Sequence, residues 1–341
     1  MGKLRDRKAA INKIQKLILK PKAELDAFRA QLEDTFANPF LPNHVECQEK
    51  VYGNVRCDFL MPEVYSSRRI IIYVHGGSFA GGSRDSYRNF CASLANAASC
   101  RLVLPEFRLP PTYPFPASIE DVQTVFRMVY SEEEVALQLE KNNFSLKVSK
   151  DDAENHAQII LAADSSGASI AIACLLNLPE KYRAIVKSLI LFSPWLDLSS
   201  ENELIAGKKI HDEVLSGEDL HRAVDLYTYA MNLKNPLVSP LLASWEKYVG
   251  FPPVYIQMGQ KEILLKQVEK FETLLKDAKV EVIKDVWPKM MFMFQMADEY
   301  LPQSHLAIEK IGKYISQRKG LTEEELAERD RILKLNDIIR D

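Results

Sequence analysis

Short runs of apolar residues recur along the chain from residue 69 onwards, and stretches with helical periodicity separate them. The runs are rich in β-branched residues, as strands are when both faces of a sheet are covered. Alternation of such strands with helices favours an α/β fold with a mostly parallel sheet flanked by helices. The predicted strands cover residues 70–74, 101–104, 158–161, 188–192, 254–258 and 280–286.

Two helices are expected before these strands, one in the first twenty residues and one over residues 22–36. The first carries seven Lys or Arg against a single acidic residue, and its apolar positions share one helical face: Leu4, Ile11, Ile14 and Ile18. A basic amphipathic helix can dock on its own domain or lie on a membrane surface. The modest apolar face favours docking.

Two further segments are predominantly polar. Residues 131–156 are interpreted as a helix end followed by a surface loop. Thr322 and Glu325 form a capping-box pair, which predicts a charged helical tail over residues 319–341.

Composition narrows the possible functions. Hydrophobic residues make up 47% of the 341 residues, enough for a sizeable core, and the net charge of -3 argues against a nucleic-acid partner. The longest apolar stretch, Ala168 to Leu176, is much shorter than the roughly 20 residues of a membrane-spanning helix. Five cysteines without a CxxC pair predict a cytoplasmic protein without a structural zinc site.

Candidate chemistry begins directly after the strand that ends at Val74. The next residues read His75-Gly76-Gly77-Ser78-Phe79-Ala80-Gly81-Gly82. Glycines permit a sharp turn and leave backbone N–H groups free to face an anion, as in an oxyanion hole. An ordinary strand-to-helix connection is the alternative.

A second candidate site follows the strand at 158–161, in the segment Ala163-Asp164-Ser165-Ser166-Gly167. A nucleophile elbow needs small residues two positions before and after its serine, and Ala163 and Gly167 satisfy this requirement. Ser and Asp are also common helix caps, so an ordinary N-cap is the alternative interpretation.

Together these segments resemble the hormone-sensitive lipase-like family of α/β-hydrolases, whose two motifs read His-Gly-Gly-Gly and Gly-Asp-Ser-Ala-Gly. The similarity extends from about Arg69 to Tyr314 and includes further segments in the family's order: Tyr113-Pro114-Phe115-Pro116-Ala117, Ser193-Pro194-Trp195-Leu196-Asp197 and Asn235-Pro236-Leu237-Val238-Ser239-Pro240-Leu241. The resemblance implies an α/β-hydrolase fold with a helical cap and hydrolysis of short or medium acyl esters without a cofactor.

The resemblance also implies domain boundaries. Residues 1–45 would form cap helices and residues 46–318 the hydrolase domain, with a cap insertion at about 198–233. The tail over residues 319–341 would be an appendage.

The family pattern assigns roles to individual residues. Ser165 would be the nucleophile, and Glu262 the acid of the triad. The oxyanion donors would be the backbone N–H groups of Gly76, Gly77 and Ser166. No metal is implied.

The family's histidine is missing. Trp287-Pro288-Lys289-Met290-Met291-Phe292-Met293-Phe294-Gln295 matches the segment in which the family reads Trp-Pro-x-Met-Pro-His-x-Phe-Gln, so Phe292 occupies the histidine position. A serine hydroxyl needs a base to take its proton, and phenylalanine has no lone pair. Ser78 and Ala163 also replace family glycines. The sequence therefore predicts a degenerate triad with weak or absent activity.

Other histidines are candidates for a substitute base. His305 is expected on a C-terminal helix, out of reach, whereas His211 and His221 belong to the cap insertion and His75 adjoins the oxyanion loop. A surface or structural role is the alternative for these three. His44 and His156 have no sequence link to the site.

The segment around Phe292 is rich in methionine, at positions 290, 291, 293 and 296. Such side chains adapt to irregular ligands, and a pocket formed with His75, Ser78, Met290 and Met291 is one hypothesis. Simple core filling is the other, and it is favoured. Glu262 needs a new partner, and Lys261 and Lys289 are nearby in sequence.

The sequence is compatible with three functional hypotheses. The first is a degenerate carboxylesterase acting on a small acyl ester. The second is a non-catalytic protein that binds a hydrophobic ligand or a protein partner. The third adds membrane-surface binding through the basic N-terminal helix.

Overall fold

The computed structural model describes residues 2–38, 40–42, 44–66, 69–144, 157–199, 202 and 212–317. The helices are α1 (Gly2–Ile14), α2 (Leu25–Phe36), α3 (Arg84–Ala98), α4 (Ala117–Phe144), α5 (Ser165–Asn177), α6 (Glu180–Arg183), α7 (Gly217–Tyr227), α8 (Leu265–Asp277) and α9 (Pro302–Gln317), with short 3-10 turns that include η1 (Gln15–Leu17) and η6 (Phe294–Met296). The strands are β1 (Val45–Tyr52), β2 (Val55–Pro62), β3 (Arg69–Val74), β4 (Arg101–Pro105), β5 (Gln158–Asp164), β6 (Val186–Phe192), β7 (Val254–Gly259) and β8 (Val282–Trp287).

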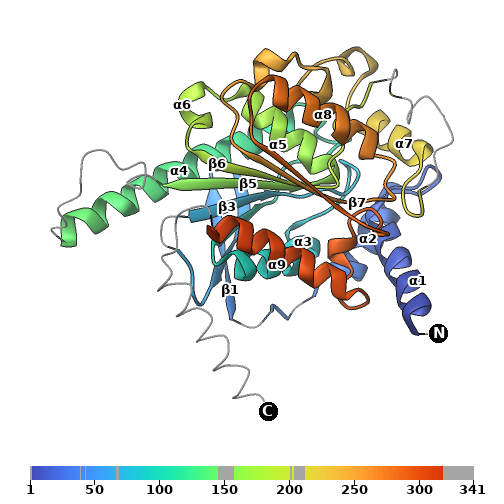
Figure 1. Cartoon of the computed structure of the whole chain (residues 1–341), viewed down its shortest axis with the longest axis horizontal. Coiled ribbons are helices and arrows are strands. Elements are labelled where there is room, and N and C mark those ends of the chain that lie inside the picture. The colour runs from blue at the N-terminus through green and yellow to red at the C-terminus, as the bar shows by residue number, and fades with distance from the viewer. Residues whose placement is uncertain are drawn as a thin grey trace.

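The eight strands form one sheet in the order β1-β2-β4-β3-β5-β6-β7-β8. β1 and β2 run antiparallel to each other and β2 runs antiparallel to β4, whereas the remaining pairs are parallel. Helices α3 and α9 cover one face, and α4, α5 and α8 cover the other (Figure 1). Every residue of β3 and β5 is buried, as two covered faces require. The predicted α/β fold is confirmed.

The six predicted strands are present as β3 to β8, but the first two strands were missed. β1 and β2 form a hairpin around Gly53-Asn54, where Gly53 has φ +63°. A Gly-Asn pair between two strand-like runs is a hairpin signal. β1 obscured this signal, because most of its residues are polar and partly exposed.

The N-terminal segment docks on the domain. Ile14 and Ile18 are buried and Ile11 is partly buried against the core. Lys20 Nζ donates to Asp219 Oδ2 at 2.8 Å, and Arg7 donates to the Lys289 carbonyl at 2.8 Å. The side chain of Leu4 lies outside the described part of the structure, but the rest of the predicted apolar face is occupied by protein, which argues against the membrane alternative for these residues.

Several predicted segments lie partly or wholly outside the described residues. Helix α4 continues to Phe144, so the polar segment at 131–156 is helical further than expected, and residues 145–156 are outside. Most of the predicted cap insertion before residue 212 and the tail over 319–341 are also outside. The predicted domain boundaries stay predictions.

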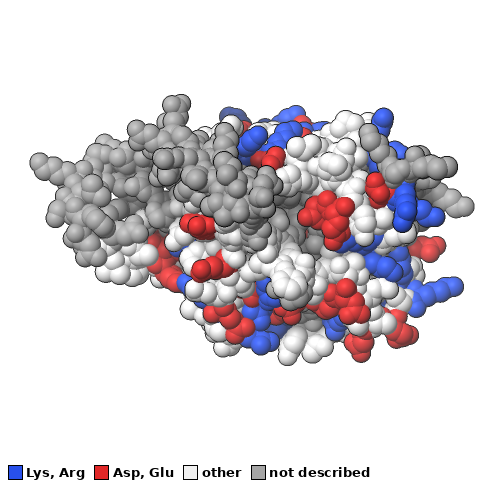
Figure 2. Space-filling model, turned by 90° about the horizontal axis from the view of Figure 1, so that it is seen from below, with Lys and Arg blue, Asp and Glu red and all other residues white. Residues whose placement is uncertain are grey.

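The described helices and surface add two observations. No helix among them combines the length and the hydropathy that crossing a bilayer requires. On the face shown in Figure 2, Lys and Arg side chains lie interspersed with Asp and Glu side chains over the described residues.

Candidate active site

Ser165 lies in a strained turn between β5 and α5. Its φ of +49° is in the left-handed region, which a non-glycine residue enters at a cost. A Cβ on Gly167 would lie 2.3 Å from the Val74 carbonyl oxygen, so the helix and strand approach too closely for any larger residue. An ordinary N-cap requires neither feature. The conformation is that of a nucleophile elbow.

Asp164 connects this elbow to the glycine-rich loop. Its Oδ1 accepts hydrogen bonds from Tyr73 Oη at 2.9 Å and from the Gly76 N–H at 2.8 Å, and its Oδ2 accepts one from Tyr87 Oη at 3.1 Å. Burial raises the pKa of Asp164 to about 7, although these donors act in the opposite direction. No role of this carboxyl group was predicted from the sequence, because its donors lie 77 to 91 positions away.

One of the three expected oxyanion donors in the glycine-rich loop and α5, the Gly76 N–H, already has a partner. The N–H of Gly76 points to Asp164 and is therefore unavailable to a substrate. The N–H groups of Gly77 and Ser78 bond to no described residue. Ser166 is in the first turn of α5, where backbone N–H groups lack helical partners. Gly77, Ser78 and Ser166 are thus the donors that remain available.

Two serine hydroxyls hold this loop in place. Ser166 Oγ accepts from the Phe79 N–H at 2.9 Å, and Ser78 Oγ accepts from the Leu19 N–H at 3.0 Å. Ser78 keeps a left-handed conformation, with φ +55°, where the family has glycine. The hydrogen bond between the Ser78 hydroxyl and the N-terminal segment helps to stabilise this conformation.

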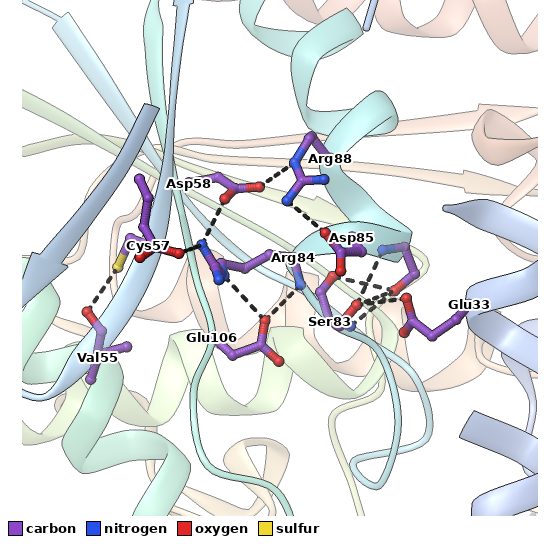
Figure 3. Close-up of polar contacts among 11 residues, drawn as sticks. Glu33, Val55, Cys57, Asp58, Ser83, Arg84, Asp85, Arg88 and Glu106 are labelled. Atoms are coloured by element: carbon purple, nitrogen blue, oxygen red, sulfur yellow. Dashed lines mark hydrogen bonds and ion pairs between the residues drawn. The ribbon is translucent and has the colours of Figure 1, made fainter. Parts of the chain in front are cut away.

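An ion-pair network fixes the end of the loop where α3 begins (Figure 3). Ser83 and Ser86 form a capping box, and Ser83 Oγ donates to Glu33 Oε2 at 2.9 Å. Arg84 and Arg88 both pair with Asp58, at 2.9 Å and 2.6 Å. The loop is thereby tied to α2 and β2.

His75 is a structural residue. Its Nδ1 donates to the Gly76 carbonyl at 2.9 Å, and its ring stacks on Phe107 and Tyr87. Burial lowers the pKa of His75, so the ring is neutral. It bonds to neither Ser165 nor Glu262.

Glu262 follows β7, and only one of its two carboxyl oxygens accepts hydrogen bonds from described residues. Oε1 accepts from Ser193 Oγ at 2.8 Å and from the Gly259 N–H, whereas Oε2 is buried without a partner among the described residues. Burial raises the pKa of Glu262 to about 8, so at neutral pH it is mostly protonated. Lys261 Nζ lies 3.8 Å from Glu213, and no described residue forms an ion pair with Glu262.

Ser165 and Glu262 lie at the same edge of the sheet, after β5 and β7, which are not neighbouring strands. β6 separates β5 from β7. Ser193, which directly follows β6, bridges the gap: its Oγ donates to Glu262 and accepts from the Met293 N–H at 3.2 Å. This role of Ser193 was not predicted from the sequence, although a serine directly after a strand was a signal for it.

Phe292 is packed into the interior, with 1% of its surface exposed. Met291 and Met293 beside it are fully buried, and Met290 is nearly so. A Cβ on Gly259 would lie 2.4 Å from the Met290 carbonyl oxygen, so this segment lies directly against the end of β7. Core filling accounts for these side chains.

The other described histidines are engaged elsewhere. His305 pairs with Glu309 at 3.2 Å, His221 with Asp225 at 3.1 Å and His44 with Glu63 at 2.6 Å. His156 and His211 lie outside the described residues. No described histidine supplies a base for Ser165.

A cavity of about 870 Å³, here called the α3–α9 cavity, lies away from Ser165. Residues 35–38 and 40–42, helices α3 and α9, and η6 contribute to its walls. Met296 lines it, whereas none of the four residues expected to form a pocket (His75, Ser78, Met290 and Met291) does so.

Comparison with known proteins agrees with this geometry. Residues 71–296 match the model of a family described as alpha/beta hydrolase fold. An acetyl-hydrolase of Streptomyces hygroscopicus is 29% identical over 252 residues, which cover 74% of this chain and 77% of that protein. An esterase of Acinetobacter venetianus is 29% identical over 250 residues, covering 73% and 75% respectively.

The fold likeness covers more of the chain. The crystal structure of an esterase from the bacterial hormone-sensitive lipase family superposes with a TM-score of 0.76 at 24% identity. The match covers 94% of this chain and 100% of the esterase.

Proposed function

This chain belongs to the α/β-hydrolase family, and from that premise we propose that it is a carboxylesterase-type hydrolase with a degenerate triad and weak or absent turnover. The substrates that fit the proposal are short or medium acyl esters, and no cofactor is needed. The observation that carries it is the pairing of an intact nucleophile elbow at Ser165 with a buried phenylalanine at the base position, Phe292.

The nucleophile and oxyanion parts support the first half of this proposal. An acyl carbonyl next to Ser165 Oγ would direct its oxygen toward backbone N–H groups of Gly77, Ser78 and Ser166. Donors fixed in advance stabilise the negative charge of a tetrahedral intermediate without reorganisation. These groups alone leave roughly 10³- to 10⁴-fold catalysis over water in a serine protease stripped of its triad.

The acid and base parts support the second half. In a complete triad the base takes the serine proton and the carboxylate holds the base in its tautomer. Glu262 Oε2 accepts no hydrogen bond from any described residue, and the raised pKa of Glu262 leaves the carboxyl group mostly neutral at pH 7. Loss of the histidine costs about 10⁶-fold in a serine protease, so efficient turnover by this route is not expected.

Hydrolysis of a short-chain p-nitrophenyl ester tests the proposal. The wild-type protein should exceed its Ser165→Ala variant only slightly or not at all. A large Ser165-dependent rate would overturn the degenerate triad and reveal another base. A rate indistinguishable from buffer for both proteins would remove support for residual activity.

A second candidate function is non-catalytic binding of a hydrophobic ligand. The α3–α9 cavity favours it, because a space of that size is available without any contribution from Ser165 or Phe292.

A further inference from the structure

Polar and apolar side chains contribute about equally to the lining of the α3–α9 cavity. Phe90, Met296 and Ile308 are buried and line it, and Phe36 is buried where α2 ends. Phe40 also belongs to the lining but is 79% exposed. A volume of about 870 Å³ falls within the range of small-molecule sites, roughly 300 to 1,000 Å³.

Two residues of the lining, Asn89 and Gln295, each carry a buried acceptor atom that has no donor among the described residues. Asn89 Oδ1 and Gln295 Oε1 are both buried and accept no hydrogen bond from any described residue. Leaving a buried acceptor unpaired costs about 1 to 3 kcal/mol. A ligand that donates hydrogen bonds would remove this cost.

The neighbouring network fixes the orientation of the Gln295 amide. Gln257 Nε2 is already committed to Asp285 Oδ2 at 3.1 Å and to the Ala307 carbonyl at 3.2 Å. The Gln257 amide therefore presents its Oε1 to Gln295, which must meet it with Nε2, at 3.1 Å. The end of Gln295 that remains unpaired is its oxygen.

The charges of the lining do not favour an anion. Its lysines, Lys13 and Lys313, are outnumbered by three acidic residues, Asp298, Glu299 and Glu309. Lys13 pairs with Glu299 at 2.6 Å, and His305 pairs with Glu309 at 3.2 Å. A carboxylate or phosphate would meet two unpaired acceptors and a lining in which acidic side chains outnumber lysines.

We propose that the α3–α9 cavity binds a neutral amphipathic molecule, a medium-chain primary alcohol or amide, whose donor group faces Asn89 Oδ1 and Gln295 Oε1. The alkyl chain packs on Phe90, Met296 and Ile308. The site is separate from Ser165 and does not depend on ester hydrolysis. Its occupant contacts η6, the turn that begins two residues after Phe292.

Isothermal titration calorimetry at pH 8 with 1-octanol, octanamide and sodium octanoate tests the proposal. Octanol and octanamide should bind with one molecule per chain, and octanoate, an acceptor-only anion at this pH, at least about tenfold more weakly. Ser165→Ala should bind octanol like the wild type, which separates this site from the nucleophile.

Three variants locate the ligand. Ser93→Phe places a ring in the cavity and should abolish octanol binding, while Asn89→Leu removes one acceptor at similar volume and should weaken it at least about fivefold. Asn12→Leu, an exposed residue outside the lining, is the matched control and should change nothing. Circular dichroism shows whether each variant is folded. If Ser93→Phe is not folded, the octanol affinity of Asn89→Leu tests the proposal.

The outcomes that overturn the proposal are specific. Octanoate binding as tightly as octanol would contradict the role of the two acceptors. Unchanged octanol binding in folded Ser93→Phe or in Asn89→Leu would place the ligand elsewhere. Absence of any binding to the wild type would also reject it, whatever the esterase assays show.

Discussion

The two sides of the candidate active site differ in how completely their polar groups are bonded. On the nucleophile side, Asp164 accepts three hydrogen bonds and Ser166 Oγ accepts one from the oxyanion loop. On the side of Glu262 and Phe292, Glu262 Oε2 has no partner among the described residues, and the Phe292 ring is buried.

This difference distinguishes polar groups that stabilise the fold from groups that would act only in catalysis. The contacts of Asp164 and Ser166 connect strands, helix and loop, so they stabilise the fold whether or not the protein turns over a substrate. An imidazole contributes mainly to chemistry, and an apolar ring can fill its place. Ser193 retains the backbone contact on that side, because it still accepts from the Met293 N–H.

The N-terminal segment contacts both sides, so its removal should have the largest effect. Leu19 bonds to Ser78 and Arg7 to Lys289. Deleting residues 1–20 exposes the surface that Ile14, Leu17 and Ile18 cover, and we expect the free energy of unfolding to fall by roughly 5 kcal/mol. Urea titration measures this change.

A shorter deletion is the control for that experiment. Removing residues 1–6 leaves Ile14, Leu17 and Ile18 in place and should be nearly neutral. Unchanged stability of the longer deletion, together with lost binding to anionic vesicles, would instead support membrane docking.

Phe292→His should give the side of Glu262 a polar group that can bond to the Glu262 carboxyl group. An imidazole at this position could take the Ser165 proton while Glu262 holds its tautomer, so we expect a rise of about 10²-fold or more in p-nitrophenyl ester turnover. Phe292→Leu is the matched control and should bring no gain. A folded Phe292→His variant without Ser165-dependent activity would indicate a remodelled site and favour the binding function.

Glu262→Gln should change how stability depends on pH. The pKa of Glu262 is about 8 when folded, against an ordinary value of 4.5, so between these values the folded state holds a proton that the unfolded state lacks. The stabilisation is complete below pH 4.5 and decreases by up to about 1.4 kcal/mol per pH unit as pH rises to 8.

Urea titrations at pH 5.5, 7 and 8.5 compare this variant with the wild type. The glutamine variant should lose less stability over this range, whereas the exposed Glu218→Gln should follow the wild type. Parallel profiles for Glu262→Gln and the wild type would show that the carboxyl group is charged when folded.

Ser78→Ala should have the smallest effect. It leaves the buried Leu19 N–H without an acceptor and should lower the free energy of unfolding by about 1 kcal/mol. Ser78→Gly loses the same bond but relieves the left-handed backbone strain, so it should be less destabilised than the alanine variant. Equal stability of all three proteins would mean that the bond contributes nothing.

Local sequence was sufficient to predict the parallel strands and the sharp turn at Ser165. Each of these depends on residues close together in the chain: a run of β-branched residues, or a serine between small residues. The hairpin of β1 and β2 was missed because exposed polar residues concealed its pattern.

Tertiary structure decided which partner each polar group has. The Gly76 N–H donates to Asp164, 88 positions away, and the Glu262 carboxyl group accepts from Ser193, 69 positions away. The α3–α9 cavity likewise combines segments from both ends of the chain. A sequence shows which groups can donate or accept, but a hydrogen bond needs its atoms within about 3 Å, and only the folded chain brings such distant residues together.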